Sequence, residues 1–173
     1  QYIRTELTAK NDRDYSPEVI AHAYALDRHI LYEKLILPLL DAGVDIYQSR
    51  SFSTSIVYQR QHAMDQNVPF NVQDILAIPG NAFCYRHPMD FLIIPTINDV
   101  QEVMNRLENR DKQDNCQWES LDFQLKVKGH YESEEFKEVF TSKGVKVIFM
   151  DAGKTLDYSK QQAIEFYQEH LRN

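Results

Sequence analysis

The longest regular pattern of apolar residues lies near the start of the chain and has helical spacing. It begins after Ser16-Pro17, where serine can cap the first turn and proline fits the first helical position. The apolar positions that carry the pattern recur at helical intervals: Val19, Ala23, Leu26, Ile30, Leu35 and Leu39. The pattern predicts a helix over 17–42 that ends at Gly43, with a kink near Pro38, because proline lacks the N–H that a helix interior needs.

Shorter apolar patterns predict that strands and helices alternate along the rest of the chain. Compact apolar runs predict strands over 44–47, 91–94 and 145–150. Helical spacing predicts helices over 3–7, 53–64, 72–78, 100–108, 118 or 120 to 131, 134–140 and 158–171. This alternation is typical of an α/β fold with a parallel sheet flanked by helices. Three strands make a thin sheet, so we expect a fold that lacks its first βα unit. The start at Gln1 instead of Met agrees with a processed or truncated chain.

The composition favours one domain and argues against several kinds of partner. The 173 residues include only five Gly and six Pro, and no repeat, so we expect a single domain over 1–173. The formal net charge of -7 argues against general nucleic-acid binding, which depends on neutralising phosphates. No apolar run reaches about 18 residues, so we expect no membrane-spanning segment. Cys84 and Cys116 are too few for a disulfide framework and lack metal-ligand spacing, which favours a reducing, cytoplasmic setting. The six histidines show no metal-ligand motif, so we expect no protein-held metal.

Two residues of the first helix are suited to binding a flat polar ring. Tyr24 and Arg28 are one helical turn apart and therefore share a face. The tyrosine can stack on a heterocycle while the guanidinium donates hydrogen bonds to it. The alternative is an ordinary packed tyrosine beside a surface arginine bonded to Asp27 or another carboxylate.

Arg50 is the strongest candidate for binding a phosphate. It follows the strand expected over 44–47, and ligands of open α/β sheets bind beyond the carboxyl ends of strands. Its planar donor fork matches phosphate oxygens. The alternative is a structural arginine that bridges a loop. Hydroxyl groups follow Arg50 at Ser51, Ser53, Thr54 and Ser55, and their alternative role is capping of the next helix.

Two later segments could contact a nucleotide. The polar stretch 106–119 carries Arg106, Arg110 and Lys112, and mobile cations stabilise the charge that develops in phosphoryl transfer. Its alternative is a solvated surface loop. The sequence Gly153-Lys154-Thr155 resembles the end of a P-loop, but Ile148 occupies the position of the required glycine. We therefore reject a P-loop there, although a nucleotide base could lie against this loop.

Taken together and in order, these segments resemble the thymidylate kinase family. The run 25–29, Ala-Leu-Asp-Arg-His, is similar to that family's Ala-Asp-Arg-x-x-His helix, and 36–43 to its Ile-x-Pro-x-Leu-x-x-Gly segment. Residues 49–59 are similar to its Asp-Arg-Tyr-x-x-Ser-Ser-x-Ala-Tyr-Gln stretch. Further similarities follow at Pro88-Met89-Asp90, Arg106, Arg110, Asp114, Glu119, Phe123, Val127, Tyr131 and 147–152. The resemblance covers nearly all of the chain.

The resemblance implies a P-loop nucleoside-monophosphate-kinase-like fold and MgATP-dependent phosphorylation of dTMP to dTDP. On the dTMP side it implies one role for each matching residue. Tyr24 would stack on thymine, Arg28 would bond its carbonyl, and Ser55 would contact the base. Tyr58 would face the deoxyribose, and Arg50 would bind the substrate phosphate as a catalytic residue.

On the ATP side, the resemblance implies a LID segment at about 107–120. Arg106 and Arg110 would flank it over ATP, with Arg110 counted as catalytic. The adenine would lie against Ala152, Gly153 and Lys154. The family also pairs subunits through helices, so the resemblance implies a homodimer with the helix 17–42 as its candidate surface.

The chain also departs from the family pattern. The P-loop and its lysine are absent, Ser49 replaces the Asp of Asp-Arg-Tyr, Ser51 replaces the Tyr, and Pro95 replaces an Asp. Without the P-loop the ATP phosphates lose most of their binding groups, so we expect the isolated chain to be incomplete or inactive. The alternatives are a non-catalytic homologue that binds nucleotide or serves as a scaffold, and a deoxynucleoside kinase, whose Glu-Arg-Ser the sequence Ser49-Arg50-Ser51 faintly resembles.

Overall fold

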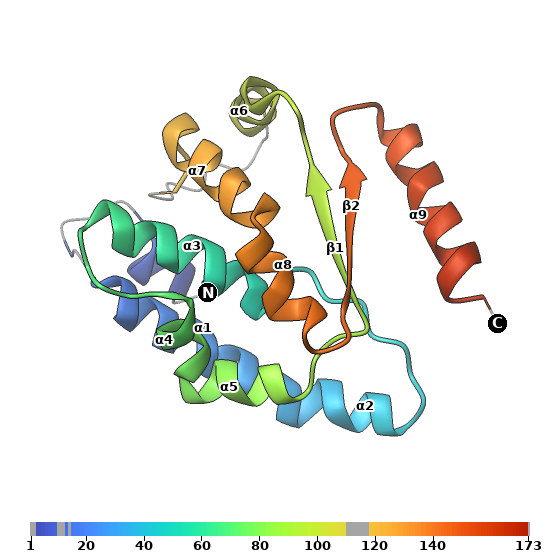
Figure 1. Ribbon diagram of the computed structural model, residues 1–173, viewed down its shortest axis with the longest axis horizontal. Coiled ribbons are helices and arrows are strands. Elements are labelled where there is room, and N and C mark those ends of the chain that lie inside the picture. Colours follow the sequence, from blue (N-terminus) through green and yellow to red (C-terminus); the bar gives the residue numbers. More distant parts are fainter. Residues whose placement is uncertain (1–2, 10–12, 14, 110–117, 173) are drawn as a thin grey trace. The chain divides into compact units, whose positions relative to one another are not determined.

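The protein is a mixed α/β protein that is mostly helical and contains a small parallel sheet (Figure 1). The structure is a computed structural model that describes residues 3–9, 13, 15–109 and 118–172. Contacts between residues group the chain into two compact units. The first comprises Gln1–Pro88 with Asp114–Glu119, and the second comprises Met89–Gln113 with Ser120–Asn173. The single domain expected over 1–173 stays a prediction.

The first unit is built from helices. Its elements are η1 (Ile3–Leu7), α1 (Pro17–Leu31), η2 (Tyr32–Ile36), α2 (Leu37–Asp41), α3 (Phe52–Asp65), α4 (Val72–Ala77) and α5 (Pro79–Arg86). Helix α1 packs against α3 and α5. The core between these helices consists of side chains that are almost fully buried: Ile20, Ala21, Phe52, Ile56, Val57, Ile75 and Cys84.

The helix expected over 17–42 forms, but it changes its winding before Pro38. Ser16 caps α1, its hydroxyl accepting a hydrogen bond from the Val19 amide at 3.4 Å. A π-helical turn, η2, separates α1 from α2, which holds Pro38 in its first turn. Proline cannot donate to the carbonyl four residues earlier, and its ring would clash with that carbonyl, so a wider turn at this point relieves both problems.

The strand expected over 44–47 is wrong. Residues 44–48 have no regular structure, and Val44 and Tyr47 are 45% and 71% exposed. An apolar run becomes a strand only where a neighbouring strand can pair with it and the faces can be buried. Among the described residues no strand pairs with this segment, and most of its side chains are exposed. Arg50 therefore follows an irregular connection and not the end of a strand.

Helix α5 was missed because Pro79-Gly80 looks like a stop signal in the sequence. Here proline occupies the first turn of a helix instead, where its missing N–H is not needed. Gly80 is required for packing, since a Cβ atom on it would collide with the backbone carbonyl of Ala25 on α1.

The second unit contains the sheet. Strands β1 (Phe91–Thr96) and β2 (Lys146–Asp151) run parallel, with Phe91 opposite Lys146 and Thr96 opposite Asp151 (Figure 1). The expected strands at 91–94 and 145–150 are thus confirmed. Among the described residues these two are the only strands of the sheet. The helices of this unit are α6 (Val100–Glu108), α7 (Leu121–Glu132), α8 (Glu134–Thr141) and α9 (Leu156–His170).

Aromatic side chains contribute to the packing of the second unit. Both α8 and α9 contact β2. Phe166 of α9 meets Phe91 of β1 edge to face, with ring centroids 5.1 Å apart. Phe136 and Phe140 of α8 are buried, and their ring centroids lie 5.0 Å apart. In the part of the chain that the structure describes, no helix is both long and apolar enough to span a bilayer.

We expect Gly80→Ala to lower the free energy of unfolding by about 1–3 kcal/mol, because the added methyl group forces α5 away from α1. Gly129 is a matched control, since it lies inside α7 and a methyl group added there would meet no atom within 4 Å. Gly129→Ala should raise stability by about 0.5–1 kcal/mol through the better helix propensity of alanine. Thermal and denaturant unfolding of both variants checks this pair. Equal effects would contradict the close approach at Gly80.

Candidate functional site

The first unit buries an arginine without an acidic partner. Arg28 on α1 is 8% exposed. Its Nη1 donates to the Ser51 carbonyl at 3.2 Å, and its Nη2 donates to the Ser55 hydroxyl at 2.5 Å. Among the described residues Arg28 forms no ion pair, and its buried Nε has no hydrogen-bond partner. The predicted alternative, a surface arginine bonded to a carboxylate, is therefore wrong.

Burying the charged guanidinium of Arg28 costs folding free energy, which makes this residue a candidate for a functional role. Removal from water lowers the pKa of its guanidinium, with nearby Cys84 acting in the opposite direction. A buried charge is tolerated when it is paired and hydrogen-bonded. Arg28 has two neutral acceptors, and its Nε is a buried nitrogen without a hydrogen-bond partner. Tyr24 is half-buried. Because Tyr24 lies one turn before Arg28 on α1, the aromatic ring and the guanidinium share one side of the helix, as the sequence predicts.

The side chain of Arg50 is exposed, and its backbone has an unfavourable conformation. Its backbone has φ of 65°, in the left-handed region that residues other than glycine rarely adopt. Its guanidinium lies over the Tyr58 ring at 5.4 Å from the centroid. Within the described ranges this ring is its only side-chain partner. Strained backbone of this kind gathers at ligand-binding sites.

The hydroxyl groups after Arg50 have mainly structural roles. Ser51 caps α3, its Oγ accepting from the Ser53 amide at 3.2 Å and lying 2.8 Å from the Ser53 Oγ. The capping alternative is thus confirmed for Ser51. Ser55 is buried and bonded to Arg28, as described above. Since Arg28 also bonds the carbonyl of Ser51, the residue after Arg50, both arginines lie at the start of α3.

Sequence reasoning assigned Tyr58 to the site but missed the aromatic side chains around it, His62 and Trp118. Tyr58 and His62 are one turn apart on α3, and Trp118 packs on both. The ring centroids of Trp118 and Tyr58 are 5.6 Å apart, and those of Trp118 and His62 are 6.1 Å apart. The only available signal was that Trp118 is the single tryptophan of the chain.

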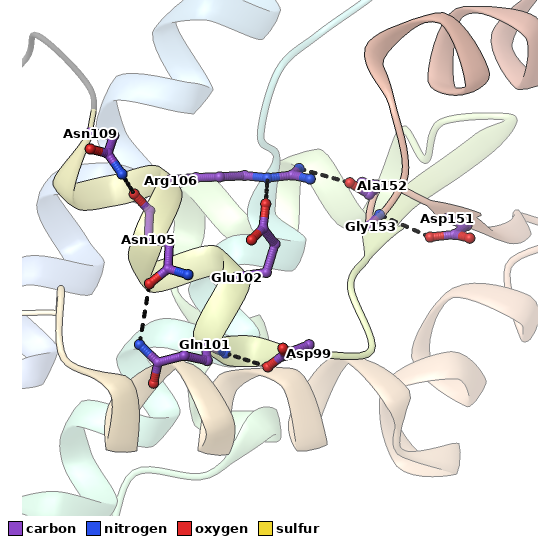
Figure 2. A network of polar contacts seen from close by, with 9 residues as sticks. All are labelled: Asp99, Gln101, Glu102, Asn105, Arg106, Asn109, Asp151, Ala152 and Gly153. Carbon is purple, nitrogen blue, oxygen red and sulfur yellow. Dashed lines mark hydrogen bonds and ion pairs between the residues drawn. The ribbon is translucent and has the colours of Figure 1, made fainter.

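The residues expected on the ATP side that the structure describes lie in the second unit, where Arg106 bonds to the loop after β2 (Figure 2). Its Nη1 donates to the Ala152 carbonyl at 2.8 Å, and its Nε donates to Glu102 at 2.8 Å. The Gly153 amide donates to Asp151 Oδ1 at 2.8 Å. The structure therefore brings Arg106 together with Ala152, whereas Arg110 lies outside the described residues.

Lys154, in the loop between β2 and α9, contacts Tyr158 of α9 and Asp151 at the end of β2. Its Nζ lies 4.0 Å from the centroid of the Tyr158 ring and 3.5 Å from Asp151 Oδ2. A hydrogen bond to Tyr158, followed by the nearby Asp151, raises the pKa of Lys154. Gln162 of α9 pairs with both backbone groups of Asp151, accepting from its amide at 3.1 Å and donating to its carbonyl at 2.8 Å. The loop after β2 is thus largely self-bonded.

The cofactor that the resemblance implies includes magnesium, a cation that prefers carboxylate and other oxygen ligands. The described residues contain no group of three or more His, Cys, Asp or Glu side chains that could hold a metal ion. Ser49 also lacks the carboxylate that a divalent cation prefers. We therefore assign no metal ligand and derive no step through a metal.

A comparison with known protein families and with curated proteins finds no match for this chain.

The buried groups around Arg28 predict a loss of stability at alkaline pH. Burial raises the pKa of the Cys84 thiol from its ordinary 9.0 to about 11. The unfolded chain then releases this proton at lower pH than the folded chain, so the contribution to stability is complete below about pH 9 and is lost as pH rises through about 11. The expected loss is up to about 2–3 kcal/mol.

Denaturant unfolding at about pH 8 and pH 10.5 measures this effect. Cys84→Ala should lose less stability between the two pH values than the wild type, because the titrating thiol is gone. Cys116 is present in both proteins and cancels. An identical alkaline loss in the two proteins would show that the Cys84 thiol does not cause it.

Proposed function

We propose that the first unit binds a pyrimidine deoxynucleoside monophosphate, dTMP, as the acceptor half of a thymidylate-kinase-like protein. The observation that carries the proposal is the pair of arginines at the start of α3. Arg28 is buried without an ion pair to the described residues, and Arg50 has left-handed backbone and a guanidinium that no described residue hydrogen-bonds. Both states cost folding free energy, and a ligand that offers a carbonyl to one and a phosphate to the other explains both.

The base would lie on the face of α1 that carries Tyr24 and Arg28. A pyrimidine ring can stack on tyrosine, and its carbonyl oxygen can accept from a guanidinium N–H of Arg28 that Ser51 and Ser55 do not use. Ser55 supports this arrangement by holding the Nη2 of Arg28 in place. These are the residues that the resemblance to thymidylate kinases assigns to the base.

The phosphate would be bound by Arg50 at the N-terminus of α3, with the sugar beside Tyr58. A guanidinium can donate two parallel hydrogen bonds to phosphate oxygens. The N-terminus of the 14-residue helix α3 adds a favourable dipole for an anion. Tyr58 already lies under the guanidinium, so it would border both the sugar and the phosphate.

The second unit would contribute the ATP side, with adenine against Ala152, Gly153 and Lys154. Bound MgATP would supply the γ-phosphoryl group and the phosphate charge that its metal neutralises. Arg106 donates to Glu102 through Nε and to Ala152 through Nη1, so its Nη2 would be the atom that reaches a phosphate oxygen. We propose that the reaction is dTMP phosphorylation and that the fold resembles that of P-loop kinases. The 173 residues themselves contain no P-loop motif.

The second candidate is a non-catalytic nucleotide-binding protein of the same fold. The bonds of Arg106 to the loop after β2 and of Lys154 to Asp151 favour it, since both cations already stabilise the second unit. In that case dTMP binding persists without turnover. A deoxynucleoside kinase would instead bind thymidine at least as well as dTMP.

We also propose a homodimer through α1 and the turns that follow it. Apolar side chains that are about half exposed lie along this stretch: Val19, Leu26, Ile30, Leu35 and Leu40. The π-helical turn η2 spaces its hydrogen-bonded residues five apart, which keeps Leu35 near the side of Ile30. Light scattering is expected to give twice the mass of the chain.

The cytoplasmic location expected from the cysteines stays a prediction.

Calorimetric titration of the wild-type chain with dTMP, thymidine and dAMP tests the proposed function. We expect dTMP to bind more tightly than thymidine, because only dTMP engages Arg50, and more tightly than dAMP, because the site is matched to a pyrimidine. An assay for ADP and dTDP then separates the enzyme from the non-catalytic protein. Failure of dTMP to bind at millimolar concentration would overturn the proposal, and tighter thymidine binding would favour the nucleoside kinase.

A further inference from the structure

We propose that Trp118 is a positioning residue for Arg50 and acts through the Tyr58 ring. This inference rests on the proposed function, in which Arg50 binds the substrate phosphate. It adds a residue distant in sequence from Arg50 that neither the motifs nor the resemblance assigned to the site. The three side chains form a continuous contact within the first unit, from Trp118 to Tyr58 to Arg50.

Trp118 is fixed against α3 at two neighbouring points. It is 7% exposed, and its ring meets Tyr58 at an interplanar angle of 66° and His62 at 70°. These are edge-to-face contacts, the arrangement that aromatic rings favour. Because Tyr58 and His62 are one turn apart, the indole spans one turn of α3 and restricts the rotation of the Tyr58 ring.

Tyr58 in turn determines where the Arg50 guanidinium lies. The Cζ of Arg50 is 5.4 Å from the centroid of the Tyr58 ring, within the range of a cation–π interaction. No hydrogen bond or ion pair to the other described residues fixes this guanidinium. If Tyr58 were free to rotate, Arg50 would sample more rotamers and lose more conformational freedom on binding a phosphate.

A purely structural role for Trp118 makes a different prediction. Loss of a buried indole that only fills space would lower stability and affect all ligands of the unit alike. Loss of an indole that positions Arg50 through Tyr58 would affect the ligand that carries a phosphate. The two roles are therefore separated by the ratio of dTMP affinity to thymidine affinity, a quantity that stability alone does not change.

The experiment compares Trp118→Leu and Trp118→Phe with wild type by titration of dTMP and thymidine. We expect Trp118→Leu to weaken dTMP binding by about fivefold and thymidine binding by less than about twofold, in the range of a lost cation–π arrangement. Trp118→Phe keeps an aromatic edge and should restore most of the dTMP affinity. Phe166→Leu, which removes a buried aromatic ring in the second unit, is the control and should leave the ratio unchanged.

A second readout does not require any variant of Trp118 to fold. Because Trp118 is the only tryptophan, selectively excited tryptophan emission reports on the surroundings of this one side chain. Saturating dTMP should change the emission, with the same Kd as calorimetry, and thymidine should change it less. Equal losses for both ligands in Trp118→Leu, or a dTMP-saturated protein with unchanged emission, would overturn the inference while leaving dTMP binding intact. A wild type that binds no dTMP would overturn the proposed function and this inference together.

Discussion

Replacing Arg50 by alanine should weaken dTMP binding by about 2–3 kcal/mol, the scale of a hydrogen-bonded pair of charges, and leave thymidine binding almost unchanged. The guanidinium is exposed and lies over Tyr58 without any described hydrogen-bond partner, so the folded protein loses little when it is removed. Arg50→Lys keeps the charge but not the planar fork, so it should also weaken dTMP, to a smaller extent. Paired calorimetric titrations of dTMP and thymidine measure both effects.

The backbone at Arg50 provides an internal check on this prediction. Arg50→Gly relieves the left-handed φ of 65° and should raise stability by up to about 1 kcal/mol while weakening dTMP as alanine does. Arg86 is a matched control, since it is another exposed arginine over an aromatic ring, 5.8 Å from the Phe83 centroid. Arg86→Ala should leave dTMP affinity unchanged. Equal losses of dTMP and thymidine in Arg50→Ala would show that Arg50 holds the fold or the base.

Replacing Arg28 by methionine should separate binding from stability. We expect dTMP and thymidine to weaken together by about 1.5–3 kcal/mol, because both lose a hydrogen bond from a charged donor to the base. We expect the free energy of unfolding to fall by less than about 1 kcal/mol or to rise. A buried charge without an acidic partner is expensive, and its replacement by an apolar side chain of similar length offsets the two lost hydrogen bonds.

The control for Arg28 is Ser55, whose hydroxyl accepts a hydrogen bond from the guanidinium. Ser55→Ala keeps the buried guanidinium and removes one of its two acceptors, so it should lower stability and weaken base binding less than Arg28→Met does. Urea unfolding and calorimetry on the same preparations give both quantities. A stability loss above about 3 kcal/mol in Arg28→Met, with unaltered ligand affinity, would make Arg28 a structural residue of the α1–α3 contact.

The elements that the sequence predicted well are those whose signals are local. Helix α3 was expected over 53–64 and extends from Phe52 to Asp65, because the Ser51 cap before it and the helical spacing along it are both local signals. The strands at 91–96 and 146–151 were found because their apolar runs are short and continuous. The segment 44–47 has a similar run, but strand formation depends on a partner elsewhere in the chain, which no local pattern shows.

The candidate site was predictable as a set of residues but not as an arrangement. Helical spacing alone placed Tyr24 and Arg28 on one face. Spacing could not show that Arg28 is buried, because its burial depends on α3 packing across α1. The contact of Trp118 with Tyr58 joins positions 60 residues apart, and Trp118 belongs to no motif that would have indicated it. The left-handed backbone of Arg50, directly before the Ser51 cap of α3, likewise has no signal in the residue pattern.

A crystal structure of the chain with dTMP tests the central claim most directly. We predict that phosphate oxygens lie about 2.7–2.9 Å from the Arg50 guanidinium, the range of charge-assisted hydrogen bonds. The same structure should show a pyrimidine carbonyl bonded to Arg28 and the base stacked on Tyr24. A dTMP molecule bound away from α1 and α3, or one whose phosphate points away from Arg50, would contradict the account.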